Sequence, residues 1–153
     1  MKRSLQATKV VIVVLATLSA LAVAETRKEY RFNVGVKATV SIVNQYGGIS
    51  VRPSTGNYVL VNATTYSDKV EVDQNQSGNR VDVQSHLLPG ATADNARVDY
   101  EVLVPADASV TMQSTTGPLH AEKLHGDVEV EGAGATVDAV SYTHLTLPTI
   151  YSV

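Results

Sequence analysis

Along most of the chain, apolar residues alternate one by one with polar residues. The clearest stretch is 98–140, in which valines occupy alternate positions and glycine separates one run from the next. Three units at its end share a pattern, a glycine followed by a short apolar–polar alternation, and they begin at Gly117, Gly126 and Gly134. An alternation with a period of two predicts β-strands that bury one face and expose the other.

The same pattern precedes this stretch. Strict alternation over 36–42 predicts a strand, and 44–48 has turn chemistry, because glycine adopts positive φ angles at no steric cost. Segment 58–65 predicts another strand. Segments 69–73 and 80–84 alternate in the same way on either side of a polar stretch, so we expect them to form a hairpin with a longer loop.

Segment 25–35 is expected to be a loosely ordered entry to the fold, with Tyr30, Phe32 and Val34 on one side if it forms a strand. Outside the first 24 residues, apolar spacing of three and four never persists for two helical turns. We therefore predict an all-β fold. Short strands punctuated by glycine favour a β-solenoid-like roll, whereas the hairpin favours an antiparallel β-sandwich; a meander with glycine turns is the third option.

The first 24 residues have the pattern of a secretory signal peptide. Lys2 and Arg3 precede an apolar run at 10–24, which ends with small residues at Ala22 and Ala24. A transmembrane anchor is the alternative, but a bilayer requires about 20 apolar residues. We therefore predict an exported protein of the periplasm or cell surface, whose single domain spans 25–140 and does not insert into the membrane after the leader is removed.

Charge and cysteine content narrow the function classes. The chain has 12 basic and 15 acidic residues, and loss of Lys2, Arg3 and Lys9 with the leader would change its net charge from −3 to −6. Nucleic-acid binding needs clustered basic residues, so a nucleic acid is not an expected partner. The chain has no cysteine, which excludes disulfides, a thiolate metal site and a lipid anchor on cysteine.

The last residues, 141–153, lack the alternating pattern. They contain no glycine, lysine, arginine or acid, and Pro148 removes a backbone donor that a strand needs. They resemble a sequencing-adapter peptide translated in frame, so we expect a non-native tail on a domain truncated near Val140. A genuine C-terminal strand is the alternative.

Two acidic side chains are the candidates for an enzyme. Asp99 and Glu101 lie two residues apart on one predicted strand face, and glycosidases use pairs of carboxylates about 5 to 9.5 Å apart. Acids that alternate with valine are more typical of the solvated face of a half-buried strand, so we expect no catalytic residue and no enzyme activity. Asn62 and Thr64 match a glycosylation sequon, a match that is common by chance.

The histidines offer one candidate metal site. His120 and His125 lie near Glu122 and Asp127 in the sequence, but a zinc site needs three or four ligands at about 2 Å from the ion. On a strand, His120 and Glu122 would share the outward face, while His125 falls in a turn. We therefore expect solvated surface histidines, no metal and no cofactor; the remaining two are His86 and His144.

Three segments carry a resemblance to a known family: 44–51 (NQYGGISV), 100–105 (YEVLVP) and 116–130 (TGPLHAEKLHGDVEV). They resemble the bacterial family of putative adhesins, exported β-rich domains also grouped as a domain of unknown function, DUF4097, and related to autotransporter adhesin heads. The Val-Pro strand end and the step from Leu124 to Gly126 match the pattern of this family. The resemblance implies a β-solenoid-like or roll fold at the cell envelope and no catalytic residues.

The expected function is therefore binding. We expect a non-enzymatic envelope protein that presents an extended β surface to an unidentified envelope or extracellular ligand, either a protein or a glycan. A structural or sensor module of a longer envelope protein and a carbohydrate-active enzyme are the alternatives.

The predicted facing of segment 126–131 gives a test. Val128→Asp would bury an unpaired charge and should lower the free energy of unfolding by about 3 kcal/mol or more. Glu129→Lys exchanges one solvated charge for another and should leave the free energy of unfolding nearly unchanged. Thermal melts of the two variants check this, and equal losses would show that the assigned facing is wrong.

Overall fold

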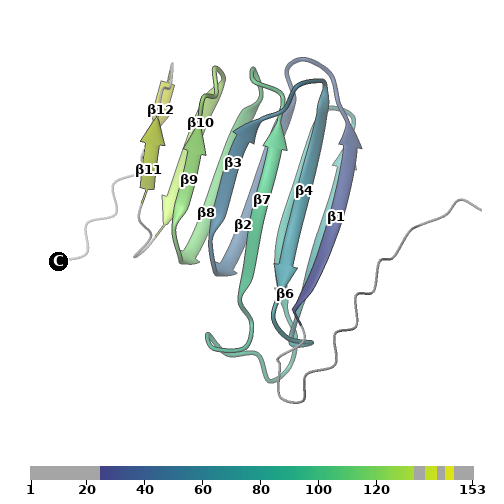
Figure 1. Ribbon diagram of the computed structural model, residues 1–153, viewed down its shortest axis with the longest axis vertical. Helices are drawn as coiled ribbons and strands as arrows, with labels where there is room; N and C mark the ends of the chain where they lie inside the picture. The colour runs from purple at the N-terminus through teal and green to yellow at the C-terminus, as the bar shows by residue number, and fades with distance from the viewer. Residues whose placement is uncertain (1–24, 133–136, 141–143, 147–153) are drawn as a thin grey trace, which may run out of the picture.

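The structure is a computed structural model that describes residues 25–132, 137–140 and 144–146, the last two ranges as backbone. Every regular element in this part of the chain is a β-strand (Figure 1), so the predicted all-β class is confirmed. The strands are β1 (Thr26–Asn33), β2 (Thr39–Tyr46), β3 (Ile49–Pro53), β4 (Tyr58–Thr65), β5 (Val70–Ser77), β6 (Arg80–Leu87), β7 (Val98–Val104), β8 (Ser109–Thr116), β9 (Leu119–Glu122), β10 (Asp127–Gly132), β11 (Val137–Val140) and β12 (His144–Thr146).

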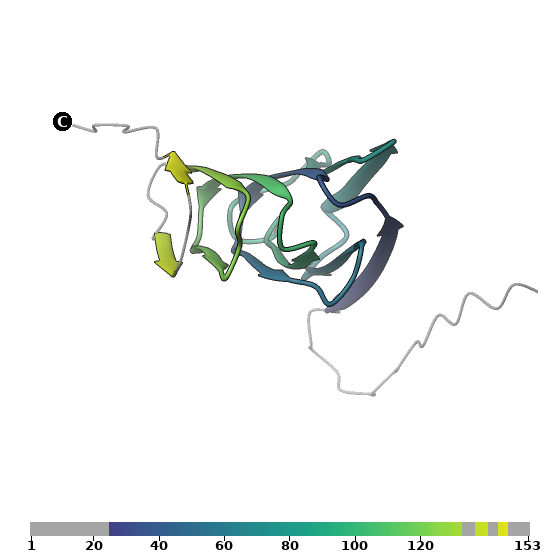
Figure 2. The same ribbon diagram turned by 90° about the horizontal axis from the view of Figure 1, so that it is seen from above.

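The strands form two six-stranded sheets that face each other. The first sheet has the order β1-β4-β7-β3-β9-β11, and the second has the order β12-β10-β8-β2-β6-β5. Both sheets are mixed: β4 pairs antiparallel with β1 and β7, β5 pairs antiparallel with β6, and the other pairs are parallel. Seen from above, the chain passes repeatedly between the two layers (Figure 2).

Three chain segments, β2–β3, β8–β9 and β10–β11, each place one strand in each sheet. Their strands lie parallel and in register: Val110 of β8 pairs with Val40 of β2 and Val128 of β10, and Ile49 pairs with Leu119. Stacking in register places apolar residues over apolar residues on the inner side. The arrangement is sandwich-like, as one of the alternatives predicted, but most of its strand pairs are parallel rather than antiparallel.

Three elements of the structure differ from the elements predicted from the sequence. Segment 25–35 is not a loose entry, because β1 pairs with β4 along its whole length; its alternation is weak since Phe32 is its one buried residue. The next strand begins at Thr39 rather than at Val36, whose residue surface is 63% exposed. The hairpin of β5 and β6 has a short loop at Gly78 and Asn79, because polar residues before Gly78 extend the strand.

The predicted leader and tail fall largely outside the described residues. The leader, 1–24, lies wholly outside them, as does Gly134 of the third glycine unit. Of the tail, 141–153, residues 144–146 are described and form β12, which pairs parallel with β10. The signal peptide and the non-native tail therefore stay predictions.

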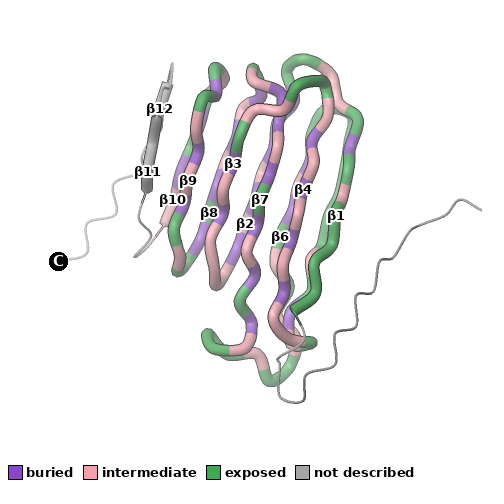
Figure 3. The backbone as a smooth tube through the Cα atoms, viewed as in Figure 1, coloured by how far each residue is buried: buried purple, intermediate pink, exposed green. Residues whose placement is uncertain are grey.

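Buried positions recur along the strands of both sheets (Figure 3). They form the core between the sheets, which consists mainly of valine. Val102 of β7 is 1% exposed, and Val128 and Val130 of β10 are 1% and 2% exposed. Asp127 and Glu129, which alternate with these valines, face solvent, so the predicted facing of β10 is confirmed. Burying each such valine side chain stabilises the fold by about 1.5 to 3 kcal/mol relative to leaving it in water.

A buried chain of polar groups joins the two sheets inside this core. The side-chain amide of Asn44 on β2 donates to the carbonyl of Val98 on β7, at 2.7 Å. The Ser85 hydroxyl of β6 donates to the amide oxygen of Asn44 at 2.7 Å, so the Tyr100 hydroxyl, also 2.7 Å away, donates to Ser85. Burial raises the pKa of Tyr100, which keeps the phenol protonated as a donor. The chain thereby satisfies polar groups whose burial would otherwise be costly.

The turns from β2 to β3 and from β8 to β9 lie in direct backbone contact. Gly47 has a φ of 112°, and a Cβ placed there would lie 2.1 Å from the carbonyl oxygen of Val98. Gly117 has a φ of 120°, and its Cβ would lie 2.2 Å from the carbonyl oxygen of Gly47. The Ser114 hydroxyl donates to the same Gly47 oxygen at 3.1 Å. Both turns therefore require glycine, for the φ angle and for the space.

Gly47→Ala tests this contact. The added methyl group would overlap the Val98 carbonyl, so the free energy of unfolding should fall by about 3 kcal/mol or more. Gly78→Ala is the control, because Gly78 also has a positive φ, 59°, but no atom lies within 4 Å of a Cβ placed there.

The control should lose only about 1 kcal/mol. Urea unfolding of both variants measures the difference. Equal losses would mean that the φ angle alone, and not the backbone contact, makes glycine necessary.

Candidate functional site

The outer side of the first sheet gathers most of the polar candidates. Strand pairing aligns one residue from each of five neighbouring strands in a single row: Glu29, Asn62, Glu101, Ser50 and His120. With neighbouring strands about 4.8 Å apart, the row extends over roughly 20 Å. We call this side the polar face and define it by the row and by the residues that flank it, Arg27, Arg31, Arg52, Thr64, Asp99 and Glu122.

Opposite charges lie next to one another on the polar face. Arg27 contacts Glu101 at 3.1 Å, and Arg52 contacts Glu122 at 3.2 Å. Nε2 of His120 lies 3.5 Å from the other carboxylate oxygen of Glu122. The side chains of Arg27 and Glu101 are 62% and 70% exposed, so their ion pair adds little to stability and can exchange for contacts with a partner.

A shallow hollow lies near the centre of the polar face. It has a volume of about 170 Å³ and is open to solvent. Backbone and side-chain atoms from three adjacent strands line it, those of Ser50, Arg52, Asn62, Glu101, Val102 and Leu103. The hollow therefore combines a cation, a carboxylate, an amide and a hydroxyl over a small area.

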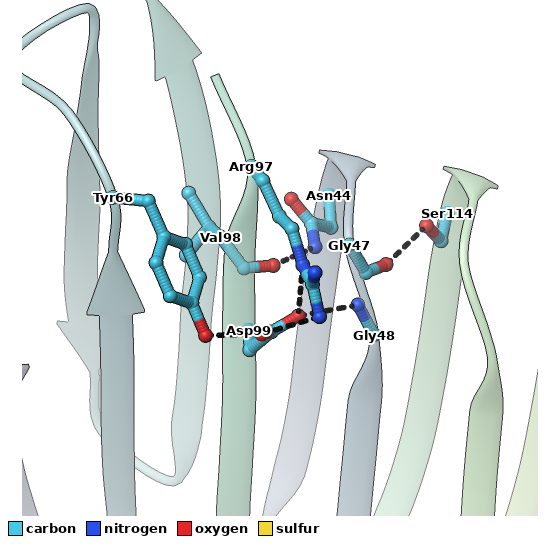
Figure 4. A network of polar contacts seen from close by, with 8 residues as sticks. All are labelled: Asn44, Gly47, Gly48, Tyr66, Arg97, Val98, Asp99 and Ser114. Carbon is cyan, nitrogen blue, oxygen red and sulfur yellow. Dashed lines mark hydrogen bonds and ion pairs between the residues drawn. The ribbon is translucent and has the colours of Figure 1, made fainter. Parts of the chain in front are cut away.

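Asp99 is the most highly coordinated side chain of this face (Figure 4). One carboxylate oxygen accepts hydrogen bonds from the backbone NH of Gly48, at 3.1 Å, and from Nε of Arg97, at 3.2 Å. The other accepts from the Tyr66 hydroxyl at 2.7 Å and lies 3.0 Å from a terminal nitrogen of Arg97. The guanidinium of Arg97 also lies 5.3 Å from the centre of the Tyr66 ring.

These contacts set the protonation state of Asp99. Burial alone would raise the pKa of Asp99, but hydrogen bonds from Tyr66, Gly48 and Arg97, together with the charge of Arg97, outweigh burial and lower it. The hydrogen bond to Asp99 raises the pKa of Tyr66, which remains a donor. Asp99 is therefore a charged acceptor on β7 that connects the β2–β3 turn to Tyr66, which follows β4, and to Arg97, which precedes β7.

The geometry does not favour the two carboxylates as an acid–base pair. A general acid needs a raised pKa, whereas the pKa of Asp99 is lowered. Glu101 is paired with Arg27 on an open surface. Asp99 and Glu101 do lie on the same face, as predicted, but their environments assign a structural role to the first and a surface role to the second.

The predicted metal candidates are divided between different parts of the fold. His120 and Glu122 lie on the polar face, and Arg52 occupies one oxygen of Glu122. His125 lies in the turn after β9, and Asp127 begins β10 in the opposite sheet. In the described part of the chain, no group of three or more His, Asp and Glu side chains is placed to hold a metal ion.

The other candidates lie in unrelated surroundings. Nδ1 of His86 on β6 lies 3.2 Å from a carboxylate oxygen of Asp73 on β5. Asn62 and Thr64 of the sequon lie on the second half of β4, half-buried on the polar face. The side chain of His144 is outside the described residues.

Sequence analysis missed several members of the polar face. Arg27 and Glu29 lie in the segment predicted to be a loose entry, and Arg52 is next to last in a short strand that ends at Pro53. Alternation with buried residues places Ser50 and Arg52 on the outer side of β3. The alternation that places Ser50 and Arg52 on the outer side can be read in the sequence. The row of polar residues cannot, because it depends on pairing between distant strands.

Comparison with known proteins supports the fold. No family model and no curated protein sequence matches the chain, so the family resemblance stays a prediction. A solved structure described as a putative adhesin from Bacteroides fragilis aligns with a TM-score of 0.56 at 13% identity, over 82% of this chain and 59% of that one. A putative cell adhesion protein from Clostridium sporogenes aligns with a TM-score of 0.46 at 11% identity, over 80% and 73% of the two chains.

At such low identity, the likeness to the Bacteroides structure shows a shared fold. The chain spans 59% of the length of that structure. Within the described residues, no helix has the length and apolar character needed to cross a membrane.

Asp99→Asn tests the role of the carboxylate. The pKa of Asp99 is lower in the folded chain than in the unfolded chain, where it is about 3.9. The charged form therefore stabilises the fold above about pH 4, and this contribution is lost as the pH falls through the folded-state pKa. At pH 7 the variant should lose about 1 to 3 kcal/mol of unfolding free energy.

Urea unfolding of the wild type and of Asp99→Asn at several pH values measures the effect. The difference between the two proteins should shrink below about pH 4, as the wild-type carboxylate becomes protonated. A difference that does not change with pH would contradict a charged acceptor.

Proposed function

We propose that this chain is a non-enzymatic, adhesin-like domain of a bacterial cell envelope, which binds its partner through the polar face. The observation that carries the proposal is the row of polar side chains across five strands, from Glu29 to His120. Together with the flanking arginines, the row offers donors, acceptors and both signs of charge along an extended surface rather than inside a cleft.

The chemistry of the polar face supports a macromolecular partner. Cores of protein interfaces are enriched in arginine, and a partner surface can replace exposed ion pairs with its own charged groups. The hollow of about 170 Å³ is small and open, so it suits one protruding group of a larger ligand better than a whole small molecule. The expected partner is a protein or a glycan outside the cytoplasm.

Two further observations support a place at the envelope. The leader pattern at 1–24 supports export to the periplasm or cell surface. The shared fold with a Bacteroides protein described as a putative adhesin supports an adhesin-like role.

The parallel strand pairs support one further element of the proposal. β2–β3, β8–β9 and β10–β11 repeat the same passage between the sheets, with strands in register. We propose that they form a β-solenoid-like stack, in which each added repeat extends the polar face by one strand. Strands β1, β4 and β5, which pair antiparallel with their neighbours, then cover one end of the stack.

An array experiment tests the proposed function. The chain from Glu25 onward, which contains every described strand, is incubated with arrays of glycans and of extracellular proteins. The double variant Arg52→Gln, Glu101→Gln removes one charge of each sign from the polar face. For any ligand of the wild type, the variant should bind at least about tenfold more weakly, which corresponds to about 1.4 kcal/mol.

The matched control is the double variant Lys37→Gln, Glu129→Gln. It also removes one charge of each sign, but from exposed positions outside the polar face. It should bind like the wild type. Absence of any ligand on both arrays, or equal losses in the two double variants, would contradict the proposal, and hydrolysis of a bound glycan that Glu101→Gln abolishes would replace it with an enzyme.

A further inference from the structure

The second sheet carries a separate hollow on its outer side, remote from the polar face. It lies between β2, β6 and the edge strand β5 and has a volume of about 280 Å³. Its polar lining comes from all three strands and includes Ser41, Asp73, Asn75, Arg80, Asp82 and Gln84. The hollow took no part in the proposed function and contains none of the candidates from the sequence.

Strand pairing fixes the arrangement of these groups. Asn75 pairs with Asp82, and Asp82 pairs with Ser41, so an amide, a carboxylate and a hydroxyl lie in one row. In the next row, Asp73 pairs with Gln84, which pairs with Val43. Two rows on adjacent strands place five polar groups and one apolar side chain on the same side of the sheet.

Each charged member of the hollow contacts another side chain, either within the hollow or beside it. Nε of Arg80 donates to both carboxylate oxygens of Asp82, at 3.1 and 3.0 Å. The carboxylate of Asp73 contacts the ring of His86 at 3.2 Å. The side chains are thus pre-oriented, and binding costs less conformational entropy than it would for free side chains.

The uncharged members are available to a ligand. Asn75 and Gln84 are exposed and Ser41 is half-buried. Their side chains make no hydrogen bond within the part of the chain that the structure describes. Each amide offers donors and an acceptor side by side, and the hydroxyl offers both.

We infer that this hollow binds a single neutral sugar residue of a glycan. A sugar has adjacent hydroxyl groups, each of which donates and accepts, and this matches alternating amide, carboxylate and guanidinium groups. Val43 supplies an apolar contact for the CH groups of the ring. The site has two carboxylates and one guanidinium, so a sugar acid would add a third negative charge and is disfavoured.

The affinity for one sugar is expected to be low. The lining contains no aromatic ring on which a sugar could stack, and a ligand this small makes few contacts. We expect a dissociation constant on the order of a millimolar, which several copies on one surface would strengthen through multivalency. The inference does not depend on the polar face, because the two sites lie on opposite sheets.

NMR titration tests the inference. The chain from Glu25 onward, labelled with 15N, is titrated separately with glucose, galactose, mannose and N-acetylglucosamine, and with glucuronate as the charged comparison. At least one neutral sugar should cause saturable shifts of the side-chain amides of Asn75 and Gln84 and of the backbone of β5 and β6. Glucuronate should bind at least about tenfold more weakly.

Variants locate the binding. Asn75→Ala and Gln84→Ala should each weaken it about tenfold or more, whereas Asn57→Ala, an exposed amide between β3 and β4 of the other sheet, should leave it unchanged. Far-UV circular dichroism verifies that all three variants are folded. Absence of saturable shifts with every neutral sugar, shifts confined to the polar face, or wild-type binding by both hollow variants would each overturn the inference.

Discussion

Backbone contact between successive turns is the constraint on which the structure depends. The turn at Gly47 packs against the carbonyl of Val98, and the turn at Gly117 packs against the carbonyl of Gly47. Asn44 and Ser114, which pair with each other across β2 and β8, bind these same carbonyls from the inner side. A turn held this closely cannot slide along its neighbour, so it fixes the register of the strands on both of its sides.

Fixed register has consequences for both surfaces. On the inner side it stacks valine on valine, so that valine is the commonest residue of the core. On the outer side it aligns polar residues from distant parts of the sequence, such as Glu29, Glu101 and His120. The same constraint therefore stabilises the fold and creates the two surfaces to which we assign binding. Its consequence is that the turns tolerate almost no substitution.

Asp99 and Glu101 lie two residues apart, but their environments give the first a structural role and leave the second available to a binding partner. Asp99 accepts hydrogen bonds from three residues beside a turn, and its lowered pKa records that stabilisation of the charged form. Glu101, two residues later, contacts Arg27 in an open setting. A partner could recruit Glu101 without disturbing the fold, whereas recruiting Asp99 would release the turn that sets the register.

The sequence by itself determined the all-β class, the buried faces of strands such as β10, and the shared face of Asp99 and Glu101, because alternation is a local property of a strand. It did not determine β1, where Phe32 is the one buried residue and the pattern is too weak to detect. Apart from the hairpin of β5 and β6, which the sequence predicts, only the tertiary structure decided which strands are neighbours. Strand pairing aligned the polar face, formed the hollow on the second sheet and placed His120 and Asp127 in different sheets. The sequence pattern does not show this pairing, because it depends on contacts between residues far apart in the chain.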